Sequence, residues 1–409
     1  MTWRDITLGE CLTIKHGYAF KGEHFAESGR HVVLTPGNFY EEGGFRSRPG
    51  KDRYYAVEPP EDFILRAGDL VVAMTEQGEG LLGSSALVPR EGSYLHNQRI
   101  GLIENLDQRK LHRQYLYHLF NTPSVRAQIR ASATGGKVRH TAPNRIYAVK
   151  VRVPSVSKQV AIADRISAYV RLSENNTRRI TLLVEAARLL YREWIVRFRF
   201  PGHEHVNAIE GLPEGWELRP LSACATFQSG GTPSKSNSEF WNGDIPWISS
   251  GELTSIRINS SKHQVTNRAV QSGSRYAEVG TILGVVRGMS LAKEFRLGIA
   301  TRRVCFNQDL KAFVPDRGIE SLFLFHALDA QRECIRQKAG EASHGTKKLE
   351  TAVLDELPII VAAPKIRRHF VEYVSPLYEQ MDILIEQNDK IQQALAILLP
   401  RLINGQISV

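Results

Sequence analysis

Cysteine is scarce in this chain, and its distribution follows no pairing pattern. The four cysteines are scattered without any C-x-x-C pair: Cys11, Cys224, Cys305 and Cys334. This spacing argues against a disulfide framework and against a structural zinc site. Long apolar runs are also missing, since the longest are far shorter than a membrane-spanning helix and the N-terminus has no apolar signal segment. We therefore expect a soluble protein of the reducing cytoplasm, with no metal and no membrane contact.

Motifs of self-contained catalysis are missing as well. The segment closest to a nucleotide-binding loop, residues 340–347, has lysine and threonine in the wrong order for a P-loop. An amino-methyltransferase would need an Asn/Asp-Pro-Pro-aromatic loop. The nearest match, residues 58–61, has glutamate at both ends in place of the Asn or Asp and the aromatic residue. Residues 315–320 carry no lysine to complete a metal-dependent nuclease site. We predict that the chain has no catalytic residues and holds no cofactor of its own.

The composition indicates a globular protein with more than one domain. The chain has 409 residues, of which 42% are hydrophobic and 23% are charged, so it has enough apolar surface to fold. At roughly 100 to 200 residues per domain, this length suggests two to four domains. Lys and Arg number 53 against 43 Asp and Glu, which gives a net charge of +10 and makes an extended polyanion a reasonable partner.

The sequence repeats itself after about half its length, which is the pattern of two related domains. The matched pairs, in chain order, are Trp3 with Trp216, Leu8 with Leu221, Gly17 with Gly230, residues 68–72 with 280–284, residues 115–118 with 323–326, and Gly136 with Gly345. In each half, short β-branched runs broken by Gly and Pro precede a long helical pattern. We predict two homologous α+β domains, each followed by a helix and joined by a Pro/Gly linker.

Both long segments carry apolar residues alternately four and three residues apart, which is a heptad seam. The first seam includes Ile162, Ile166, Ile180, Leu183 and Leu190. The second includes Tyr373, Leu377, Leu384, Gln387, Ile391 and Leu398. Two such seams in one chain can pair with each other. Polar residues in the middle of both, such as Asn176 and Gln380, either fix the register of the pair or mark a stretch where it loosens.

Pro376 lies inside the second helical pattern. Because proline removes a helical hydrogen bond and suits the first turn of a helix, we predict a break or kink near Ser375, with the long helix starting there. We expect this helix to end near Leu402, ahead of Asn404 and Gly405.

Two basic stretches without acids occur, one in each half. Residues 135–152 contain Lys137, Arg139, His140 and Arg145, and residues 253–277 contain Arg257 and Lys262. Such stretches suit contact with phosphates, although a solvated basic face is the ordinary alternative. Polar side chains in Gly-rich segments, such as Thr75, Gln77 and Arg287, have the hydrogen-bonding capacity to read base edges. A structural role is an equal alternative for each of them.

These considerations give a set of candidate DNA-binding residues. They are Lys15, Lys21, Thr75, Gln77, Asn97, Gln98, Arg99, Lys137, Arg139, His140 and Arg145 in the first half, and Thr232, Ser234, Lys235, Arg257, Lys262, Arg287, Ser290, Arg302, Arg303, His344, Thr346 and Lys347 in the second.

Three segments resemble one known family. Residues 230–249, with GGTPSK followed by FWNGDIPWIS, resemble the opening of a target-recognition domain in type I restriction-modification specificity subunits. Residues 189–202 look like the central conserved region of that family, and residues 398–405 look like its C-terminal signature. Three places depart from the pattern: a single Pro precedes Gln159, Arg367 stands where Gln is expected, and residues 17–21 replace the Gly-Thr-Pro-Ser run in the first half.

The resemblance implies an α+β fold with a pseudo-twofold internal repeat, in which two homologous α/β target-recognition domains are separated by two long antiparallel coiled-coil helices. We place the first recognition domain at residues 1–155, the first spacer helix at 156–200, the second recognition domain at 201–363 and the second spacer helix at 364–409. A helix of some 30 residues rises roughly 45 Å, which is comparable to a turn or so of duplex DNA at about 34 Å per turn. Helices of this length can hold the two domains on successive major grooves, so we expect helix length to set the spacing of the two half-sites.

The implied function is that of a non-catalytic DNA-specificity subunit in a cytoplasmic restriction system for phage defence. Each domain is expected to read one half of a bipartite, asymmetric target in double-stranded DNA. The implied partners are two methyltransferase (M) subunits for adenine methylation and restriction/motor (R) subunits, which would use S-adenosylmethionine, ATP and magnesium. We expect them to contact the outer faces of the long helices, which carry Arg165, Arg178, Arg188, Arg192, Glu379, Asp382, Glu386 and Lys390.

Four alternatives remain open. The chain could be an orphan specificity subunit that serves a methyltransferase only. It could be another DNA-binding scaffold with coiled-coil separators, or a structural scaffold with no nucleic-acid role. A fused enzyme with methyltransferase activity of its own is the fourth class, and labelling of DNA by the purified chain with S-adenosylmethionine would reveal it.

Overall fold

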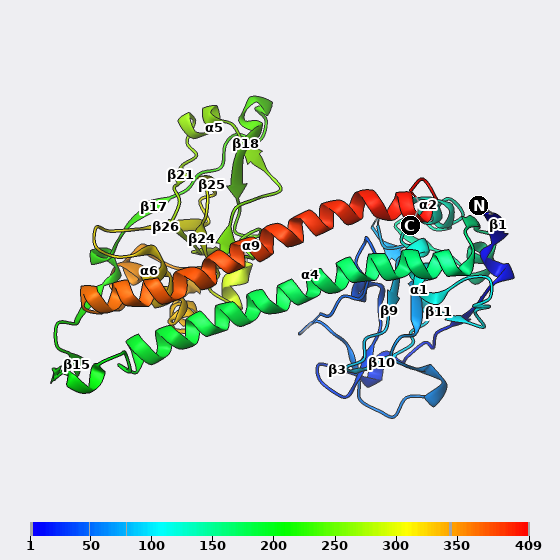
Figure 1. Ribbon diagram of the computed structural model, residues 1–409, viewed down its shortest axis with the longest axis horizontal. Helices are drawn as coiled ribbons and strands as arrows, with labels where there is room; N and C mark the ends of the chain where they lie inside the picture. Colours follow the sequence, from blue (N-terminus) through cyan, green and yellow to red (C-terminus); the bar gives the residue numbers. More distant parts are fainter. Residues whose placement is uncertain (1–2, 49, 79, 343–345, 408–409) are drawn as a thin grey trace. The chain divides into compact units, whose positions relative to one another are not determined.

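The two halves of the chain fold into two units that share one topology (Figure 1). The computed structural model describes residues 3–48, 50–78, 80–342 and 346–407. The first unit comprises Met1–Asn175 and Gln387–Val409, and the second comprises Asn176–Glu386. Each unit therefore contains one α+β domain, part of the first long helix and part of the second.

A four-stranded antiparallel sheet forms the centre of the first unit. Its order is β2-β11-β7-β9, with the bounds Thr13–His16, Ile100–Glu104, Leu70–Ala73 and Ser85–Leu87. Strand β7, with the sequence Leu-Val-Val-Ala, is buried along its whole length, because an apolar, β-branched run suits a pleated surface packed on both faces. A second sheet has the order β3-β5-β4-β10-β6, with the bounds Phe25–Ala26, Tyr54–Tyr55, His31–Val33, Ser93–Leu95 and Ile64–Leu65. Three short helices accompany these sheets: α1 (Arg113–Phe120), α2 (Pro123–Ala131) and α3 (Pro143–Tyr147).

The second unit is built in the same way. Its central sheet has the order β17-β26-β22-β24-β19, with the bounds Ala225–Ser229, Leu310–Pro315, Ile282–Val285, Leu297–Ala300 and Arg257–Ile258. Its second sheet has the order β20-β18-β25-β21, with the bounds Gln264–Val265, Trp241–Ile248, Val304–Phe306 and Tyr276–Ala277. The short helices are α5 (Asn267–Gln271), α6 (Ser321–Asp329), α7 (Arg332–Gln337) and α8 (Thr351–Asp355).

Strand pairing confirms the internal repeat at the level of topology. The order β2-β11-β7-β9 corresponds to β17-β26-β22-β24. In the second sheet of each unit, one parallel pair, β4 with β10 and β18 with β25, is flanked by antiparallel strands on both sides. The predicted α+β fold class with two homologous domains is therefore confirmed.

In each unit the chain enters and leaves side by side. Strand β1 (Arg4–Thr7) pairs antiparallel with β13 (Lys150–Val153), and β16 (Glu217–Pro220) pairs in the same way with β29 (Pro358–Val361). A long helix starts shortly after each closing strand. The linker between the domains forms a small hairpin of β14 (Ala208–Ile209) and β15 (Leu212–Pro213).

The long helices are α4 (Val156–Tyr191), which ends in a π-helical turn at Arg192–Val196, and α9 (Pro364–Ile403). In the first unit, Ile162 and Ile166 of α4 belong to the same hydrophobic core as Leu398 and Leu402 of α9. In the second unit, Ala187 and Tyr191 of α4 share a core with Phe370 and Val374 of α9. The start of one helix therefore packs with the end of the other, which confirms the antiparallel pairing. The described helices include none long and apolar enough to span a membrane.

The predicted break of α9 near Ser375 is wrong. The helix begins at Pro364 and continues through Pro376 without a break. A proline inside a helix costs about 3 kcal/mol, but burial of Phe370, Val374 and Tyr378 on either side contributes roughly 1.5–3 kcal/mol for each side chain, so packing outweighs the lost hydrogen bond. The predicted end near Leu402 is confirmed.

Two of the predicted seam positions of α9 are exposed, whereas the others, among them Leu377, Leu384, Ile391 and Leu398, are buried or half-buried. Tyr373 is 62% exposed, whereas the adjacent Val374 is fully buried together with Tyr378 and Met381. Gln387 is exposed as well. The burial pattern there follows the packing of α9 on its own domain, which differs from the seam between two isolated helices. The predicted seam positions of α4 are all buried or half-buried.

Candidate nucleic-acid interface

A two-stranded ribbon brings together two of the predicted binding segments in the first unit. Strand β8 (Thr75–Gln77) pairs antiparallel with β12 (Val138–His140), so that Thr75 lies opposite His140 and Gln77 lies opposite Val138. The Thr75 hydroxyl lies 3.1 Å from Nδ1 of His140. Thr75 is buried, whereas Gln77 and His140 are exposed. The ribbon therefore mounts polar and basic side chains on backbone that is fixed by strand pairing.

The loop that leads into β12 is held by its own side chains. Gly135 has φ +106°, a left-handed conformation that favours glycine, and Thr134 forms a bridge with His140. Arg145 donates from Nη1 to the Thr134 hydroxyl at 2.9 Å and to the His140 carbonyl at 3.4 Å. Arg145 thus braces the loop, while Lys137 is exposed on it.

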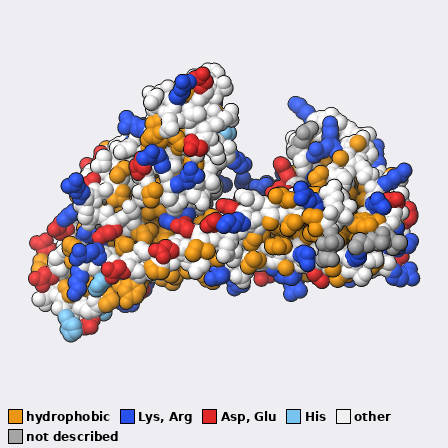
Figure 2. All heavy atoms as spheres, turned by 45° about the horizontal axis from the view of Figure 1, so that its top comes forward, with side chains coloured by type: hydrophobic (Ala, Val, Ile, Leu, Met, Phe, Trp, Pro, Cys, Tyr) orange, Lys and Arg blue, Asp and Glu red, His pale blue; other side chains and the backbone are white. Residues whose placement is uncertain are grey.

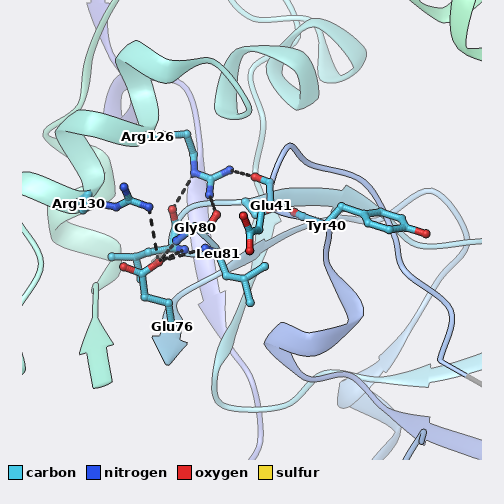
Figure 3. A network of polar contacts seen from close by, with 9 residues as sticks. Tyr40, Glu41, Glu76, Gly80, Leu81, Arg126 and Arg130 are labelled. Carbon is cyan, nitrogen blue, oxygen red and sulfur yellow. Dashed lines mark hydrogen bonds and ion pairs between the residues drawn. The ribbon is translucent and has the colours of Figure 1, made fainter. Parts of the chain in front are cut away.

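A buried carboxylate organises the loop after β8. Glu76 is only 1% exposed, and its Oε2 accepts hydrogen bonds from the backbone N–H groups of Gly80, Leu81 and Leu82 at 2.9–3.1 Å (Figure 3). Successive N–H groups that converge in this way form a nest for an anion. Arg126 of α2 fixes the other side of the loop, since it donates to the carbonyls of Leu82, Glu41 and Gly80.

Neither Glu76 nor Arg126 was among the residues predicted from the sequence. Burial lowers the pKa of Arg126 to about 10, and the guanidinium remains charged near neutral pH. The sequence holds one signal for this site, because Glu76 lies between two predicted binding residues, Thr75 and Gln77. Its burial depends on the loop that wraps around it, which no linear pattern displays.

The turn at residues 97–99 lies next to the ribbon. The Met74 N–H donates to the Arg99 carbonyl at 3.0 Å, which ties the turn to the residue before β8. Asn97 is buried and accepts a hydrogen bond from the Arg99 N–H at 3.1 Å, so it shapes the turn, whereas Gln98 and Arg99 are exposed. A side chain on Gly17 would overlap the Asn97 carbonyl, which explains the glycine at that position.

The second unit has an equivalent ribbon. Strand β23 (Arg287–Gly288) pairs with β28 (Lys347–Lys348), which pairs in turn with β27 (Gly340–Glu341). The N–H groups of Val286 and Arg287 donate to the Asp309 carbonyl, as Met74 does to Arg99. The predicted residues Arg287 and Lys347 therefore come together on one ribbon.

Two further predicted residues, Ser290 and Thr346, belong to the surroundings of this second ribbon. Ser290 is half-buried in the short helix that follows β23. Thr346 is half-buried beside β28. His344 lies outside the described residues.

The Gly-Gly-Thr-Pro-Ser segment forms a loop fastened by two indoles. Trp241 donates from Nε1 to the Ser234 carbonyl at 3.1 Å, and Trp247 donates to the Gly231 carbonyl at 3.2 Å. Side chains on Gly230 or Gly231 would overlap the carbonyls of neighbouring segments. The loop exposes Thr232, Ser234 and Lys235, so the motif works as a scaffold whose polar residues face solvent.

A second Asn-Gln turn was not predicted from the sequence. Asn307 and Gln308 occupy the place of Asn97 and Gln98, and Thr232 donates from its hydroxyl to Oε1 of Gln308 at 2.7 Å. The signal was available, because the Asn-Gln doublet occurs at matching positions of both halves. Only the first copy was among the predicted residues.

Other predicted residues make contacts away from the ribbons. Arg257 forms a bidentate ion pair with Asp382 of α9 and lies 5.1 Å from the ring centre of Tyr378. Arg303 pairs with Glu278 at 2.8 Å, and Arg302 donates to the Asp244 carbonyl at 3.3 Å. In the first unit, Lys15 donates to the Asp62 carbonyl at 2.9 Å, and Lys21 lies 3.8 Å from Glu23. Lys262 is exposed.

Two charges expected on the outer faces of the long helices are engaged within their own unit. Arg188 donates to both carboxylate oxygens of Asp329 at 2.8 and 3.2 Å, and Asp382 is the partner of Arg257. On the face drawn in Figure 2, Lys and Arg side chains are spread over the surface and interspersed with acids. The excess positive charge is therefore distributed and forms no single stripe on that face.

The described residues contain no group of three or more His, Cys, Asp or Glu side chains placed to hold a metal ion. What the two ribbons offer is hydrogen-bonding side chains and cations on braced loops, an arrangement suited to contact with base edges and phosphates.

Comparison with known proteins gives one family. Residues 1–185 and 213–393 each match the family model described as the type I restriction modification DNA specificity domain. The specificity subunit of the type I restriction enzyme EcoR124I/EcoR124II from Escherichia coli is 28% identical over 158 residues, which are 38% of this chain and 39% of that protein. The MjaIX specificity subunit from Methanocaldococcus jannaschii is 26% identical over 208 residues, which are 49% of this chain and 46% of that protein. The alignments thus span less than half the length of these relatives.

A solved structure of the same family has a similar fold. The crystal structure of a type I restriction-modification S subunit from M. genitalium superposes with a TM-score of 0.61 and 15% sequence identity, covering 98% of this chain and 96% of that one.

Proposed function

The chain belongs to the family of the type I restriction modification DNA specificity domain, of which it carries two copies, and on this premise we propose that it is the sequence-specificity subunit of a type I restriction-modification complex. One observation carries the proposal. The same braced ribbon occurs once in each domain, and each ribbon gathers predicted binding residues from segments far apart in the sequence. Each domain then reads one half of a bipartite target in double-stranded DNA.

The two ribbons differ in the residues that they carry. Thr75 opposite His140 in the first unit corresponds to Arg287 opposite Lys348 in the second. The first pair exposes an imidazole, whereas the second exposes a guanidinium and an ammonium group, which favour guanine. The two half-sites therefore differ in sequence, and the target is asymmetric.

In this proposal the chain is not an enzyme. It supplies specificity, and separate methyltransferase subunits use S-adenosylmethionine to modify adenine. Restriction and motor subunits use ATP and magnesium. Support comes from the sequence, which lacks the motifs for these reactions, and from the family to which the chain belongs.

Exposed hydrophobic side chains on the long helices support docking of such partners. They are Val170, Leu172, Leu182 and Leu189 on α4 and Tyr373, Ile383 and Ile397 on α9, with exposed fractions of 37% to 62%. Large apolar side chains that recur along an exposed helix are typical of protein interaction surfaces. Because the chain is an internal repeat, it offers two similar surfaces to two copies of one partner.

Methylome sequencing tests the proposal directly. Cells with and without this gene are compared, and we expect deletion to remove one bipartite methyl-adenine motif while all other motifs persist. An unchanged methylome would contradict the function. Loss of the motif without any loss of phage restriction would favour a specificity subunit that serves a methyltransferase only.

Two measurements separate the remaining classes. If the purified chain methylates DNA unaided when given S-adenosylmethionine, it is a fused enzyme. If the complex with its partners binds DNA negligibly and without dependence on salt, the chain is a structural scaffold, because phosphate contacts always confer salt dependence.

A further inference from the structure

A shallow hollow of about 520 Å³ lies in the first unit, between the end of α2 and the loop that leads into β12. It is lined by Ala127, Arg130, Ala131, Ala133, Gly135 and Arg139. Four of these six residues are Ala or Gly, so the hollow has a floor of small side chains between two guanidinium groups. A tetrahedral oxyanion on an extended polymer can reach such a site without meeting a bulky side chain.

The two arginines are held near the hollow but have spare hydrogen-bonding capacity. Arg130 points from α2 towards Glu76 (Figure 3), yet its Nη2 lies 3.8 Å from Oε2, too far for a hydrogen bond. That Oε2 is already occupied by three backbone N–H groups. Arg139 lies opposite Glu76 in the ribbon and is half-buried, with no ion pair among the residues that the structure describes.

The second unit shows what the same place looks like when its charges are neutralised. Residues 129 and 130, Ile-Arg, correspond to residues 335 and 336, again Ile-Arg at the end of a short helix, with both isoleucines fully buried. Arg336, however, pairs with Glu333 through Nε and Nη2 at 2.8 and 2.5 Å and donates from Nη1 to the Ala292 carbonyl. Glu333 occupies the position that Ala127 has in the first unit.

The other cation is also neutralised in the second unit. By strand register, Lys347 opposite Gly288 corresponds to Arg139 opposite Glu76. Lys347 lies 3.3 Å from the carboxylate of Glu341. Two homologous domains thus share a pair of cations, and within the described residues only the first domain leaves the pair without exposed acidic partners.

We propose that this hollow in the first unit is a binding site for a phosphate group of the DNA backbone, with Arg130 and Arg139 as its donors. The inference rests on the proposed function and adds a contact that the second domain lacks. A guanidinium presents its donors in a fork that matches phosphate oxygens. Backbone contacts carry no sequence information but fix the register of the reader on the duplex. Glu76, which its backbone nest fixes in place, holds Arg130 at the hollow through their ion pair at 3.8 Å.

The test is the salt dependence of duplex binding by the full chain in complex with its methyltransferase partners. A fluorescently labelled duplex of mixed sequence is titrated at several salt concentrations, and the slope of log K against log[salt] is measured. Each phosphate contact that is lost reduces this slope by about 0.9. We expect reductions of this size for both Arg130→Ala and Arg139→Ala.

A third variant copies the second domain. Ala127→Glu places a carboxylate where the homologous helix already tolerates one in Glu333, so the fold is retained while Arg130 acquires an internal partner. We expect the same reduction in slope, with an unchanged thermal unfolding midpoint. The matched control is Arg336→Ala, which removes the corresponding arginine of the second domain and leaves the slope at its wild-type value.

The outcomes separate this site from the function on which it rests. Wild-type slopes in Arg139→Ala and Ala127→Glu, with DNA binding intact, overturn the phosphate site and leave the specificity function standing. An equal effect of Arg336→Ala overturns the asymmetry between the domains and with it the proposal. Absence of DNA binding by the wild-type complex at every salt concentration contradicts the proposed function itself.

Discussion

Buried histidines link the stability of both units to pH. His118 in α1 and His326 in α6 occupy matching positions of the repeat, and burial lowers the pKa of each to about 4. The ordinary value for histidine is about 6.5. Between these two values the unfolded chain binds a proton that the folded chain excludes. Above pH 6.5 the two histidines therefore do not reduce the free energy of unfolding. As the pH falls towards 4, each of them reduces it by up to about 3 kcal/mol.

We predict that His118→Leu removes this part of the acid sensitivity from the first unit. Nε2 of His118 is buried without a hydrogen-bond partner in the described structure, so an apolar side chain of similar size loses no contact there. Thermal unfolding between pH 7 and pH 4 should show a smaller decrease in the midpoint of the first unit than in the wild type. His205→Leu in the exposed linker is the control and should retain the wild-type pH dependence. Identical curves for His118→Leu and the wild type would show that His118 is protonated in the folded state.

Gln159 in the first half and Arg367 in the second occupy matching positions at the start of the long helices, and both donate hydrogen bonds to backbone carbonyls there. Gln159, fully buried at the start of α4, donates to the carbonyls of Pro154 and Lys110 and accepts from the His112 N–H. Arg367 takes its place at the start of α9 and donates to the carbonyls of Ala362 and Gly318. Arginine has no acceptor.

Glu320 completes the arrangement around Arg367. Its carboxylate lies 3.1 Å from the guanidinium, at the chain position that corresponds to His112. The departure from the family pattern at Arg367 is thus compensated within the same domain.

Arg367→Ala should destabilise the second unit by roughly 3–5 kcal/mol, since it leaves Glu320 without its partner and two carbonyls unpaired. Arg367→Gln should cost less, because the amide retains donors for the two carbonyls. Urea unfolding followed by Trp fluorescence measures both midpoints, and Arg368→Ala, on an exposed neighbouring position, is the control. Equal losses for Ala and Gln would mean that the charge pair alone stabilises this junction.

At the scale of elements, the sequence predicted the long helices and the buried face of α4, but only part of the face that α9 buries. Spacing alone placed Tyr373 in the seam, whereas Val374, Tyr378 and Met381 pack into the domain core. A heptad pattern describes two helices that meet each other. Helix α9 must also cover its own sheet domain, and that demand comes from tertiary contacts that the local spacing does not contain.

The ribbons illustrate the same limit for the candidate site. Thr75 and His140 were recognised separately by residue type, and their pairing depends on the strand register of β8 with β12. Glu76 was missed because a carboxylate between two polar residues has the pattern of an exposed position. Its burial is stabilised by three N–H groups of a loop that only the folded chain brings together.

Pro376 gives a prediction for helix α9. The proline is exposed and interrupts the hydrogen-bond ladder of a helix that packing holds together on the opposite face. Pro376→Ala restores one N–H donor and so stabilises the helix by about 3 kcal/mol. The greater conformational freedom of the unfolded chain opposes this gain by about 0.4–1 kcal/mol. We expect a net gain of about 2 kcal/mol in the second unit, measured as a higher urea midpoint.

The control for this prediction is Pro364→Ala. Pro364 is the first residue of α9, where proline costs nothing because the first turn lacks intrahelical acceptors for its N–H groups. That variant should leave the midpoint nearly unchanged. A lower midpoint for Pro376→Ala would indicate that the helix bends at the proline to reach its packing partners.

At the scale of the whole molecule, residues from both ends of the described chain pack together in the first unit. The first unit is assembled from both ends of the chain, Met1–Asn175 and Gln387–Val409. Trp3 packs so closely on Gly405 that a side chain at that glycine would overlap the indole. Ile407 packs against the core of the same unit, and the Tyr115 hydroxyl donates to the Ile403 carbonyl at 3.2 Å. The two ends are therefore neighbours within one unit.

This arrangement predicts that a circularly permuted chain folds and functions. Residues 201–211 of the linker are all exposed, and cuts in exposed loops are tolerated because they disturb few contacts. A chain that begins at His205, with a short Gly-Ser segment joining residue 407 to residue 3, should unfold within a few degrees of the wild type. In complex with its methyltransferase partners it should confer the same bipartite methylation motif. A control that is opened between Met74 and Thr75 cuts the chain between the buried strand β7 and the first ribbon, and it should lose the first unit. A permuted protein that folds but methylates only one half-site, or a different motif, would show that the covalent order of the domains contributes to specificity beyond the contacts that each domain makes.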